Sequence, residues 1–449
     1  MITKNFIGYL SILFCFCGPM FIPSTNQNYL YDDDDRIVIY HGLNLSNTSK
    51  STPDNLPWTT QSDLNKLNQW GFNLVRYLVF WSAIEPQKDS INQDYIQQTI
   101  QRINWLDSLG VDVIIDLHQD LFNTKFSGNG FPSWVINDDS LPFTLQQPWF
   151  NNYYQPAVIA CYRNFWTNPQ NISSYLKVIK IIQNSFDSMP NVIGIDVMNE
   201  PFPVIPKDFN TVSLQNITTT TKELVTFEQN YLSPLYDSVN QIGFKKRVFF
   251  EPVIYTSIGI PTMLNFKTKS NNVYYPHYYD PLCESGKSYT DLTRKTMDLA
   301  FKIKVKEAQT MKVPLLYGEF GISTVPRYSD YLTQFLNLAD RYSVGWTYYS
   351  FDRGPFGVLN NDGSDAPQLK YLVRPYPMRI AGRNPLFTAT DSSLTLTYDN
   401  IGLTGLTEIF IPWQLYDVKI NGVYTEQMNN VFKYQNDDLI KQKIEIYRR

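Results

Sequence analysis

Short runs rich in β-branched and aromatic residues alternate with longer amphipathic runs from Ile37 onward, and this alternation constrains the fold more than any other feature. In the longer runs the apolar residues recur at steps of three and four, as on one face of a helix. Such alternation predicts a parallel sheet with crossover helices. The expected strands are Ile37–Leu45, Leu74–Val79, Val111–Leu117, Val192–Val197, Arg247–Val253, Asn272–His277, Pro314–Glu319 and Val344–Tyr349.

Eight strand–helix pairs over roughly 320 residues are typical of a single α/β domain, a (β/α)8 TIM barrel with long loops. A doubly wound open sheet is the structural alternative. Its commonest support is a glycine-rich phosphate loop after a strand, and no expected strand is followed by one. The clearest expected helices are Asp94–Leu109, Ser174–Ser188, Lys222–Ile242, Thr290–Thr310 and Ser329–Tyr342.

The rhythm of the chain changes near Leu372. After Arg374-Pro-Tyr-Pro377 come short alternating runs separated by Gly, Asn and Asp. This pattern predicts a small antiparallel β-sandwich. We therefore expect a catalytic barrel over residues 30–371 and a β-sandwich domain over 372–449. The expected sandwich strands include Leu394–Tyr398, Glu408–Ile411, Tyr416–Ile420 and Lys443–Tyr447.

Residues 1–26 have the pattern of a signal peptide. Lys4 precedes an apolar run from Phe6 to Ile22, which is short for a membrane-spanning helix. A signal anchor that stays in the membrane is the alternative. Glycosylation sequons also fit a secretory route, so we expect a secreted protein or one of the lysosomal or endosomal lumen. The sequons are at Asn44, Asn47, Asn171 and Asn216.

Charge and cysteine content narrow the choice of partners and of compartment. Charged residues make up 18% of the 449 residues and the formal net charge is -4. Electrostatics therefore give no reason to expect nucleic acid or an anionic membrane as a partner. Cys161 and Cys283 remain after signal cleavage, and the sequence leaves open whether they pair in an oxidising compartment.

Polar residues gather where the expected strands end, which is where catalytic residues lie in a barrel. The fourth expected strand runs into Met198-Asn-Glu-Pro201 and the seventh into Tyr317-Gly-Glu-Phe-Gly321. A single strand-end glutamate is usually a surface carboxylate, but a pair of this kind suits glycoside cleavage, which needs carboxyl groups on both sides of the scissile bond. Strands four and seven lie across a barrel mouth, so Glu200 and Glu319 are the candidates.

All three histidines of the chain, His41, His118 and His277, fall near expected strand ends. Three histidines can bind zinc, which makes a metal site the alternative. Catalytic zinc usually has closely spaced ligands or a motif such as H-E-x-x-H, and the chain has neither. We therefore expect no metal, with the histidines hydrogen-bonded to sugar hydroxyls and carboxylates. A serine hydrolase has no support, because G-x-S-x-G does not occur.

The ordered set of motifs resembles glycoside hydrolase family 5, and within it the endoglycoceramidases and related glycosylceramide hydrolases. The family set is Asn199-Glu-Pro201, Gly318-Glu-Phe-Gly321, Arg76, His118, His277 and Trp346. The subgroup segments are His41-Gly-Leu-Asn44 with Lys50, Trp81 with Glu85-Pro86, Leu117-His-Gln-Asp-Leu-Phe122, Gly128-Asn-Gly-Phe-Pro-Ser-Trp134, Phe250-Glu-Pro252 and Arg374-Pro-Tyr-Pro377 with Ile380-Ala-Gly382. The resemblance covers nearly all of the chain after the signal.

The resemblance implies a retaining mechanism with Glu200 as acid/base and Glu319 as nucleophile, and it implies no metal or organic cofactor. Tyr279 is implied to lie beside the nucleophile, and it is preferred over Tyr278 because it shares a strand face with His277. His41 departs from the pattern, since family members often carry Arg there. The residues implied to bind substrate are Lys50, Arg76, His118, Asp120, Asn199, His277, Tyr279 and Trp346, with Arg76 holding the nucleophile ionised and Asn199 binding the sugar 2-hydroxyl.

The segment Asp120–Cys161 is long and rich in aromatic rings, and a loop of this length at the active face is usually functional. Part of these rings is expected to pack against the barrel and the rest to contact a lipid. With the resemblance, this predicts hydrolysis of the bond between glycan and ceramide in a glycosphingolipid. The membrane surface is then contacted only through the lipid substrate. The rings are Phe122, Phe126, Phe131, Trp134, Phe143, Trp149, Phe150, Tyr153 and Tyr154.

Other functions stay open at this point. The nearest in chemistry is a β-glucosidase acting on glucosylceramide or a sterol glucoside, or an endo-β-glucanase. A glycolipid-binding protein without activity is the alternative of another class, but a pure binder has no need of both carboxylates. A structural secreted protein with an inert barrel would not need the ordered polar residues at the strand ends.

Overall fold

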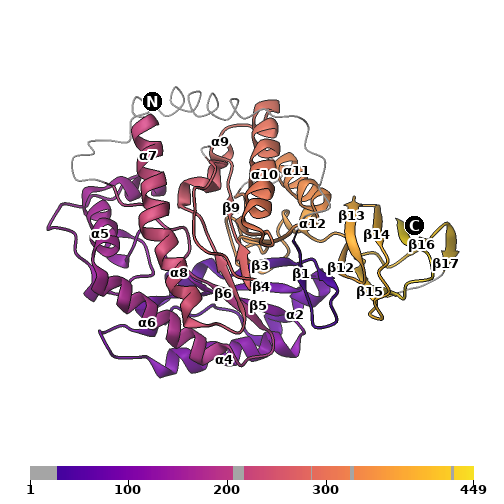
Figure 1. Ribbon diagram of the computed structural model, residues 1–449, viewed down its shortest axis with the longest axis horizontal. Helices are drawn as coiled ribbons and strands as arrows, with labels where there is room; N and C mark the ends of the chain where they lie inside the picture. Colours follow the sequence, from indigo (N-terminus) through magenta and orange to yellow (C-terminus); the bar gives the residue numbers. More distant parts are fainter. Residues whose placement is uncertain (1–27, 206–216, 285, 324–327, 426–428) are drawn as a thin grey trace. The chain divides into compact units, whose positions relative to one another are not determined.

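The computed structural model describes residues 28–205, 217–284, 286–323, 328–425 and 429–449 (Figure 1). The expected signal peptide and the sequon at Asn216 lie outside these ranges and stay predictions. Within the described ranges, no helix is both long and apolar enough to span a bilayer. The chain packs as two compact units, Leu45–Gln61 with Arg76–His277, and 28–44 with Ser62–Val75 and Tyr278–Arg449.

Nine strands in the described part of the chain form one sheet: β3 (His41–Leu45), β4 (Leu74–Val79), β5 (Asp112–Leu117), β6 (Val192–Asp196), β7 (Arg247–Phe250), β8 (Asn272–Tyr274), β9 (His277–Tyr278), β10 (Leu316–Phe320) and β11 (Gly345–Tyr348). Their order is β8-β7-β6-β5-β4-β3-β11-β10-β9. β5 to β8 pair in parallel, as do β10, β11 and β3. Their residues are almost entirely buried, as the apolar runs predict for strands covered on both faces. The predicted (β/α)8 barrel is confirmed.

The sixth predicted strand, Asn272–His277, is split into β8 and β9. Pro276 lies between them and has no N–H to donate, so a continuous ladder is interrupted there. β8 neighbours β7 at one end of the strand order and β9 neighbours β10 at the other. This broken strand is therefore the one that closes the barrel.

Helices follow the strands where the three- and four-residue periodicity predicted them. Local capping sets their starts: Asn92 accepts from the backbone N–H of Tyr95 at 3.1 Å, and Thr290 forms a capping box with Thr293. α4 packs on β5, and α6 packs against α8 (Figure 1). The helices are α2 (Gln61–Trp70), α3 (Trp81–Ile84), α4 (Gln93–Ser108), α5 (Pro156–Thr167), α6 (Pro169–Phe186), α7 (Ile217–Phe227), α8 (Ser233–Ile242), α9 (Pro281–Glu284), α10 (Asp291–Met311), α11 (Ser329–Arg341) and α12 (Leu369–Leu372).

The C-terminal part is an antiparallel sandwich, as predicted. Strands Ser393–Asp399 and Lys441–Arg448 carry buried residues at alternate positions, and these, such as Leu394, Leu396, Ile444 and Ile446, belong to one apolar core. The strands are β12 (Tyr376–Ile380), β13 (Arg383–Ala389), β14 (Ser393–Asp399), β15 (Thr407–Phe410), β16 (Tyr416–Ile420), β17 (Val423–Thr425), β18 (Val431–Tyr434) and β19 (Lys441–Arg448). One sheet has the order β13-β14-β19-β16-β17.

The other sheet of the sandwich begins with two N-terminal strands, β1 (Leu30–Tyr31) and β2 (Ile37–Val38), in the order β1-β2-β12-β15-β18. The first predicted strand, Ile37–Leu45, is therefore two strands, and only β3 enters the barrel. Val38 pairs with Arg379 of β12 across this sheet. Residues 30–38 thus belong with the sandwich rather than with the barrel domain predicted from residue 30. The predicted boundary at 371 falls inside α12.

The expected secretory features have mixed outcomes. Cys161 and Cys283 are buried free thiols, so the structure has no bond between these two described cysteines. Asn47 is exposed, but Asn44 is fully buried, and its side-chain amide donates to the backbone oxygens of Gly318, Thr347 and Tyr348 at 3.2–3.4 Å. An asparagine used in this way cannot carry a glycan.

Asn44 is expected to stabilise the fold, because it donates to buried carbonyls in the middle of β10 and at the end of β11. Asn44→Ala should lower the free energy of unfolding by ~1–3 kcal/mol, the cost of leaving buried acceptors without a donor. The measurement is urea unfolding followed by fluorescence. Asn47→Ala, which alters an exposed residue of the neighbouring sequon, should stay within ~0.5 kcal/mol of the parent. Equal losses in both variants would contradict this role.

Candidate active site

The carboxyl end of β5 carries a chain of charged side chains. His118 Nδ1 lies 2.7 Å from Asp116 Oδ2, and its Nε2 lies 3.2 Å from Asp120 Oδ2. Lys50 Nζ lies 2.8 Å from the same oxygen of Asp120. Against the effect of burial, Lys50 and His118 hold the pKa of Asp120 far below its usual value. The structure thus brings Lys50, His118 and Asp120 together, as the sequence predicted.

Arg76, on β4, is completely buried and is surrounded by acidic groups. Its Nη2 atom lies 3.1 Å from Asp116, 2.7 Å from Asp196 and 3.0 Å from Glu251. The same nitrogen donates to Asn199 Oδ1 at 2.9 Å. Burial raises the pKa of both Asp196 and Glu251, and the positive charge of Arg76 acts in the opposite direction. The predicted contact of Arg76 with Glu319 joins the two units and stays a prediction.

The predicted acid/base residue follows β6 and is held mainly through its backbone. Glu200 has a φ of 42°, a left-handed conformation that is uncommon outside glycine. Gln119 Nε2 donates to the backbone oxygens of Asn199 at 2.8 Å and Glu200 at 3.1 Å, and Glu251 Oε2 accepts from the N–H of Glu200 at 2.9 Å. The Glu200 side chain is 16% exposed, and His277 Nδ1 lies 2.9 Å from its Oε1. A partly exposed carboxyl on a fixed backbone suits proton transfer to a ligand.

The predicted nucleophile lies on β10 in the second unit. Glu319 is 5% exposed, and the Tyr279 hydroxyl donates to its Oε2 at 2.9 Å. Tyr278 turns to the other face, where its ring packs against Tyr331 and Phe335. The structure therefore places Tyr279, and not its neighbour, beside Glu319, because alternate strand residues point to opposite faces.

Two sequence-based expectations need correction. His41 begins β3 instead of ending it, and its ring is stacked between Trp346 at 4.3 Å and Tyr376 at 3.7 Å. Trp346 lies near the start of β11, opposite His41, and is fully buried in this stack, so it is a core residue away from the strand ends that carry the site. Tyr349, which directly follows β11 and is 8% exposed, is the aromatic residue near the strand end. The ring of Phe356 lies between Tyr349 and Tyr279: its centroid is 6.3 Å from that of Tyr349 and 6.5 Å from that of Tyr279.

The sequence-based interpretation did not assign a role to Asp116, Gln119, Asp196 or Glu251. All four are buried and contact the predicted site residues. A signal was present for the acidic ones, because Asp116 and Asp196 interrupt apolar strands and Glu251-Pro252 repeats the glutamate–proline pattern of Glu200-Pro201. Gln119 lies within the subgroup segment Leu117–Phe122, but nothing in the sequence indicated its role, which depends on a long-range backbone contact.

The ring-rich segment after β5 divides into a packed part and an exposed part. Phe131 stacks on Phe122 with ring centroids 4.2 Å apart, and Trp134 packs edge-on against Trp81 and donates to the backbone oxygen of Glu85. The first part of the segment is therefore core. The exposed apolar side chains come later in the segment: Leu141, Leu145, Trp149, Phe150 and Tyr154, each 39–55% exposed.

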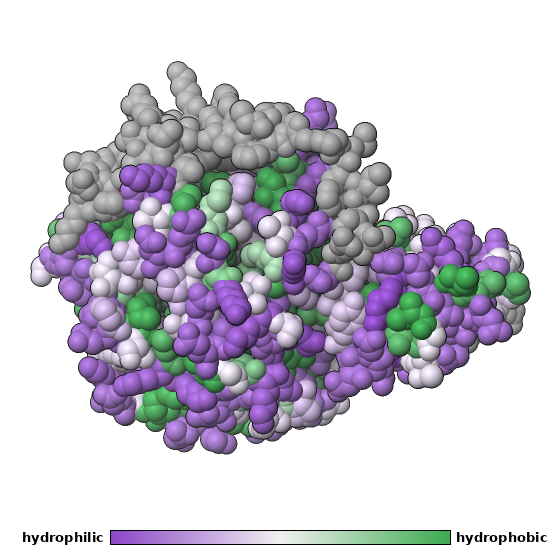
Figure 2. Space-filling model, in the orientation of Figure 1, coloured by the Kyte–Doolittle hydropathy of each residue, from purple (hydrophilic) through white to green (hydrophobic). Residues whose placement is uncertain are grey.

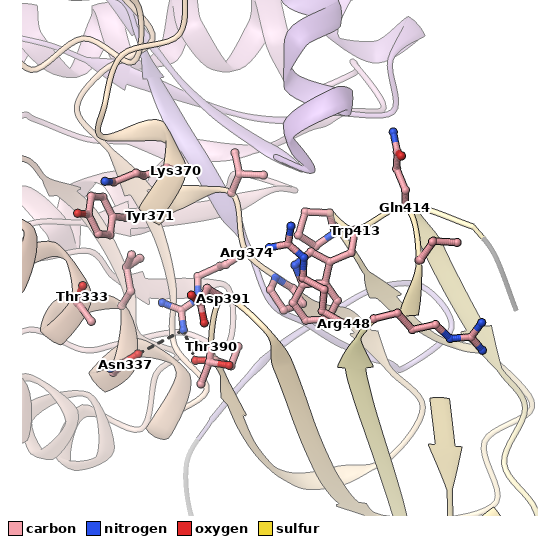
Figure 3. A pocket seen from close by; sticks show the side chains of 17 residues that line it. Thr333, Asn337, Lys370, Tyr371, Arg374, Thr390, Asp391, Trp413, Gln414 and Arg448 are labelled. Atoms are coloured by element: carbon pink, nitrogen blue, oxygen red, sulfur yellow. Dashed lines mark hydrogen bonds between the residues drawn. The ribbon is translucent and has the colours of Figure 1, made fainter. Parts of the chain in front are cut away.

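A pocket of about 740 Å³ lies elsewhere in the second unit, lined by residues of α11, α12 and the sandwich (Figure 3). Arg374 lines it, and its Nη2 donates to Asp340, to the backbone oxygen of Ala389 and to Asn337. None of the predicted site residues lines this pocket. The candidate chemistry is therefore at the strand ends and not in this hollow.

Removing the buried cation is expected to destabilise the protein in a pH-dependent way. Arg76→Met leaves Asp116, Asp196 and Glu251 without their common partner, which should cost ~3–5 kcal/mol at pH 7.5. The folded-state pKa values of Asp196 and Glu251, which burial already raises, then rise further above the unfolded values, so protonation relieves part of the cost and the deficit should shrink at pH 5. Urea unfolding at the two pH values measures this. Arg294→Met, at an exposed pair with Asp330, should cost at most ~1 kcal/mol at either pH. A deficit for Arg76→Met that grows on acidification would contradict the charge assignment.

Known proteins that are similar to this chain include endoglycoceramidases. An endoglycoceramidase of Hydra vulgaris is 23% identical over 92% of this chain and 86% of its own length, and endoglycoceramidase I of Rhodococcus hoagii is 26% identical over 88% and 80%. Solved structures of endo-glycoceramidase II from Rhodococcus sp. superpose over 94% of this chain and all of theirs. One is a lactosyl-enzyme intermediate, with a TM-score of 0.81 and 27% identity, and another a ganglioside GM3 complex, with 0.82 and 26%.

Residues 33–354 match the sequence model of the cellulase family, glycosyl hydrolase family 5. This range runs from the sandwich strand β2 through the last barrel strand and includes both candidate glutamates. The resemblance inferred from the sequence motifs is therefore confirmed, and the chain belongs to glycosyl hydrolase family 5.

Proposed function

We propose that this protein is a retaining endoglycoceramidase, in which Glu200 and Glu319 cleave the bond between the glycan and the ceramide of a glycosphingolipid. The observation that carries the proposal is the pair of strand-end glutamates, each with its own partner, in a family 5 barrel. Two relatives that span most of this chain are endoglycoceramidases, and the similar endo-glycoceramidase II from Rhodococcus sp. was solved with ganglioside GM3. The substrate class follows from these relatives, and the residue roles follow from the contacts of each glutamate.

Glu319 is the proposed nucleophile. Its carboxyl is nearly buried, and the hydroxyl of Tyr279 donates to it, which favours the charged form that attacks. Attack on the anomeric carbon forms a bond from the carboxylate oxygen to the sugar, and the ceramide oxygen leaves. The covalent glycosyl-enzyme is the intermediate of retaining glycosidases, and a lactosyl-enzyme is what was solved for the relative from Rhodococcus sp..

Glu200 is the proposed acid/base. Its proton goes to the departing ceramide oxygen, which would otherwise leave as a poorly stabilised alkoxide. The resulting carboxylate then takes a proton from the water that attacks the glycosyl-enzyme, and this step frees the glycan and regenerates Glu319. His277, 2.9 Å from Glu200, orients the carboxyl in both steps. The different surroundings of the two glutamates suit their different roles.

Sugar recognition is proposed for Lys50, Asp120, His118 and Asn199. Lys50 is 19% exposed and its partner Asp120 is 8% exposed, so both can meet a hydroxyl while keeping their ion pair. Asn199 and His118 are more deeply buried and are already held by Arg76 and Asp116. Polar side chains that are already held in place can orient the sugar without losing further conformational entropy on binding.

The ceramide is proposed to lie against the exposed apolar side chains of the segment after β5. Burial of alkyl chain contributes about 0.8 kcal/mol per methylene, so even partial contact would dominate binding. Trp149, Phe150 and Tyr154 provide the exposed rings. On the described surface turned toward the viewer in Figure 2, green apolar groups are scattered among purple polar ones.

Substrate choice is tested by incubating the protein with a ganglioside, glucosylceramide and carboxymethylcellulose. An intact oligosaccharide and ceramide should appear from the ganglioside, and the first-formed sugar should be the β-anomer by proton NMR. Release of glucose or of new reducing ends alone would favour the glucosidase or glucanase instead.

Glu319→Gln should remove nearly all turnover, because a neutral amide cannot form the covalent intermediate. A variant that keeps more than about a tenth of the rate, a barrier change of only ~1.4 kcal/mol, is incompatible with a nucleophile.

The exposed rings should matter only for lipid substrates. Trp149→Ser combined with Phe150→Ser should raise the KM for glycosylceramide at least about tenfold, the effect of losing ~1.4 kcal/mol of apolar contact. A soluble aryl glycoside of the same glycan, which lacks the lipid, should change less than about twofold. Leu386→Ser, at a comparably exposed apolar residue of the sandwich, is the matched control. Equal loss on both substrates would make the rings structural, and no change on either would place the lipid elsewhere.

A further inference from the structure

We propose that Glu251 is a positioning residue for the acid/base: it holds the backbone N–H of Glu200 directly and the carboxyl of Glu200 through His277. This inference rests on the proposed role of Glu200. Glu251 is 2% exposed and directly follows β7, one strand over from the end of β6. It therefore acts through other residues and does not contact the sugar itself.

The two carboxyl oxygens of Glu251 have different tasks. Oε2 accepts the N–H of Glu200 at 2.9 Å. Oε1 accepts from Arg76 Nη2 at 3.0 Å and lies 3.0 Å from His277 Nε2. The other ring nitrogen of His277 lies 2.9 Å from Glu200 Oε1. Glu251 thus reaches both ends of the same residue, its backbone and its carboxyl.

The backbone contact has a physical purpose, because Glu200 is held at a φ of 42°. A non-glycine residue in this region costs about 1–3 kcal/mol and keeps the conformation only where its surroundings fix it. Glu251 holds the N–H, and Gln119 holds the C=O at 3.1 Å. The peptide groups on both sides of the strained residue are therefore anchored, which aims the Glu200 carboxyl in one direction.

The contact through His277 links the charges of two carboxyl groups. An imidazole has one nitrogen for each of them, so the charge on Glu251 changes how well the ring donates to Glu200. The pKa of Glu251 is raised well above its usual value, chiefly by burial. The neighbouring Asp196 adds to this increase, and His277 and Arg76 oppose it. Three charged or titratable side chains, His277, Asp196 and Arg76, thus connect Glu251 with the acid/base Glu200 and its surroundings.

Glu251→Gln is the informative substitution, because both oxygens of Glu251 accept hydrogen bonds and an amide offers only one acceptor. Whichever way the amide turns, its NH2 faces a donor, either Arg76 or the N–H of Glu200. The acid step should suffer, and the loss should depend on the leaving group. For glycosylceramide, whose alkoxide needs a proton, kcat/KM should fall about 100-fold, as for loss of a general acid. For a dinitrophenyl glycoside of the same glycan, kcat/KM should fall less than about fivefold.

The ratio of the two kcat/KM values does not depend on how much protein is folded, so partial unfolding cannot produce this result. Asp340→Asn is the matched control, since Asp340 is a buried carboxylate paired with an arginine, Arg374, away from the site residues. It should leave the ratio unchanged. If Glu251→Gln does not fold, Glu251→Asp, which withdraws the carboxyl by one methylene, should change the ratio in the same direction.

Glu200→Gln separates this inference from the proposed function. It should show the same dependence on the leaving group, with turnover of the dinitrophenyl glycoside restored by azide, which attacks the glycosyl-enzyme without a base. If Glu200→Gln lacks this behaviour, the proposed acid/base is wrong. If Glu200→Gln shows it and Glu251→Gln loses activity equally on both substrates, or on neither, Glu251 is only structural and this inference is overturned.

Discussion

The buried guanidinium of Arg76 is the interaction on which the rest of the site depends. It contacts Asp116 of β5, Asp196 of β6 and Glu251 after β7, while Arg76 itself lies on β4. Acidic groups at this depth repel one another and lose hydration, and the guanidinium offsets part of that cost. With it, four neighbouring strands are tied together by their polar ends, and Asn199, next to Glu200, joins the same network.

The two strand-end glutamates have different chemical surroundings, although both lie at the ends of similar apolar strands. Glu200 is linked to the network through Glu251 and His277, and its carboxyl stays partly exposed. Glu319 is nearly buried and is partnered by a tyrosine hydroxyl. A retaining mechanism needs one carboxyl that gives and takes a proton and one that attacks, and such a division of roles is produced by environment rather than by residue type.

The features predicted best from sequence were those with a local cause. Strand β4 and helix α11 begin where the apolar pattern placed them, because periodicity reports which face is buried. The glutamates at positions 200 and 319 stood out because a charged residue ends an apolar strand. The failures were non-local: Ile37–Leu45 looked like one strand, but Ile37 and Val38 pair with β12, more than three hundred residues away.

Burial by distant partners also decided which conspicuous residues belong to the site. Trp346 and Phe131 matched the chemistry of a sugar or lipid contact, yet Trp346 stacks on His41 and Phe131 stacks on Phe122 inside the protein. Glu251 had the same glutamate–proline signature as Glu200, but its partners are Arg76 and His277, so it is a buried support. By itself the sequence determined the barrel, the sandwich and the identity of the two strand-end glutamates, because these follow from periodicity and residue type along the chain. Only the tertiary structure decided which rings are exposed and which acids are buried supports, because burial and ion pairing depend on residues that are far apart in sequence.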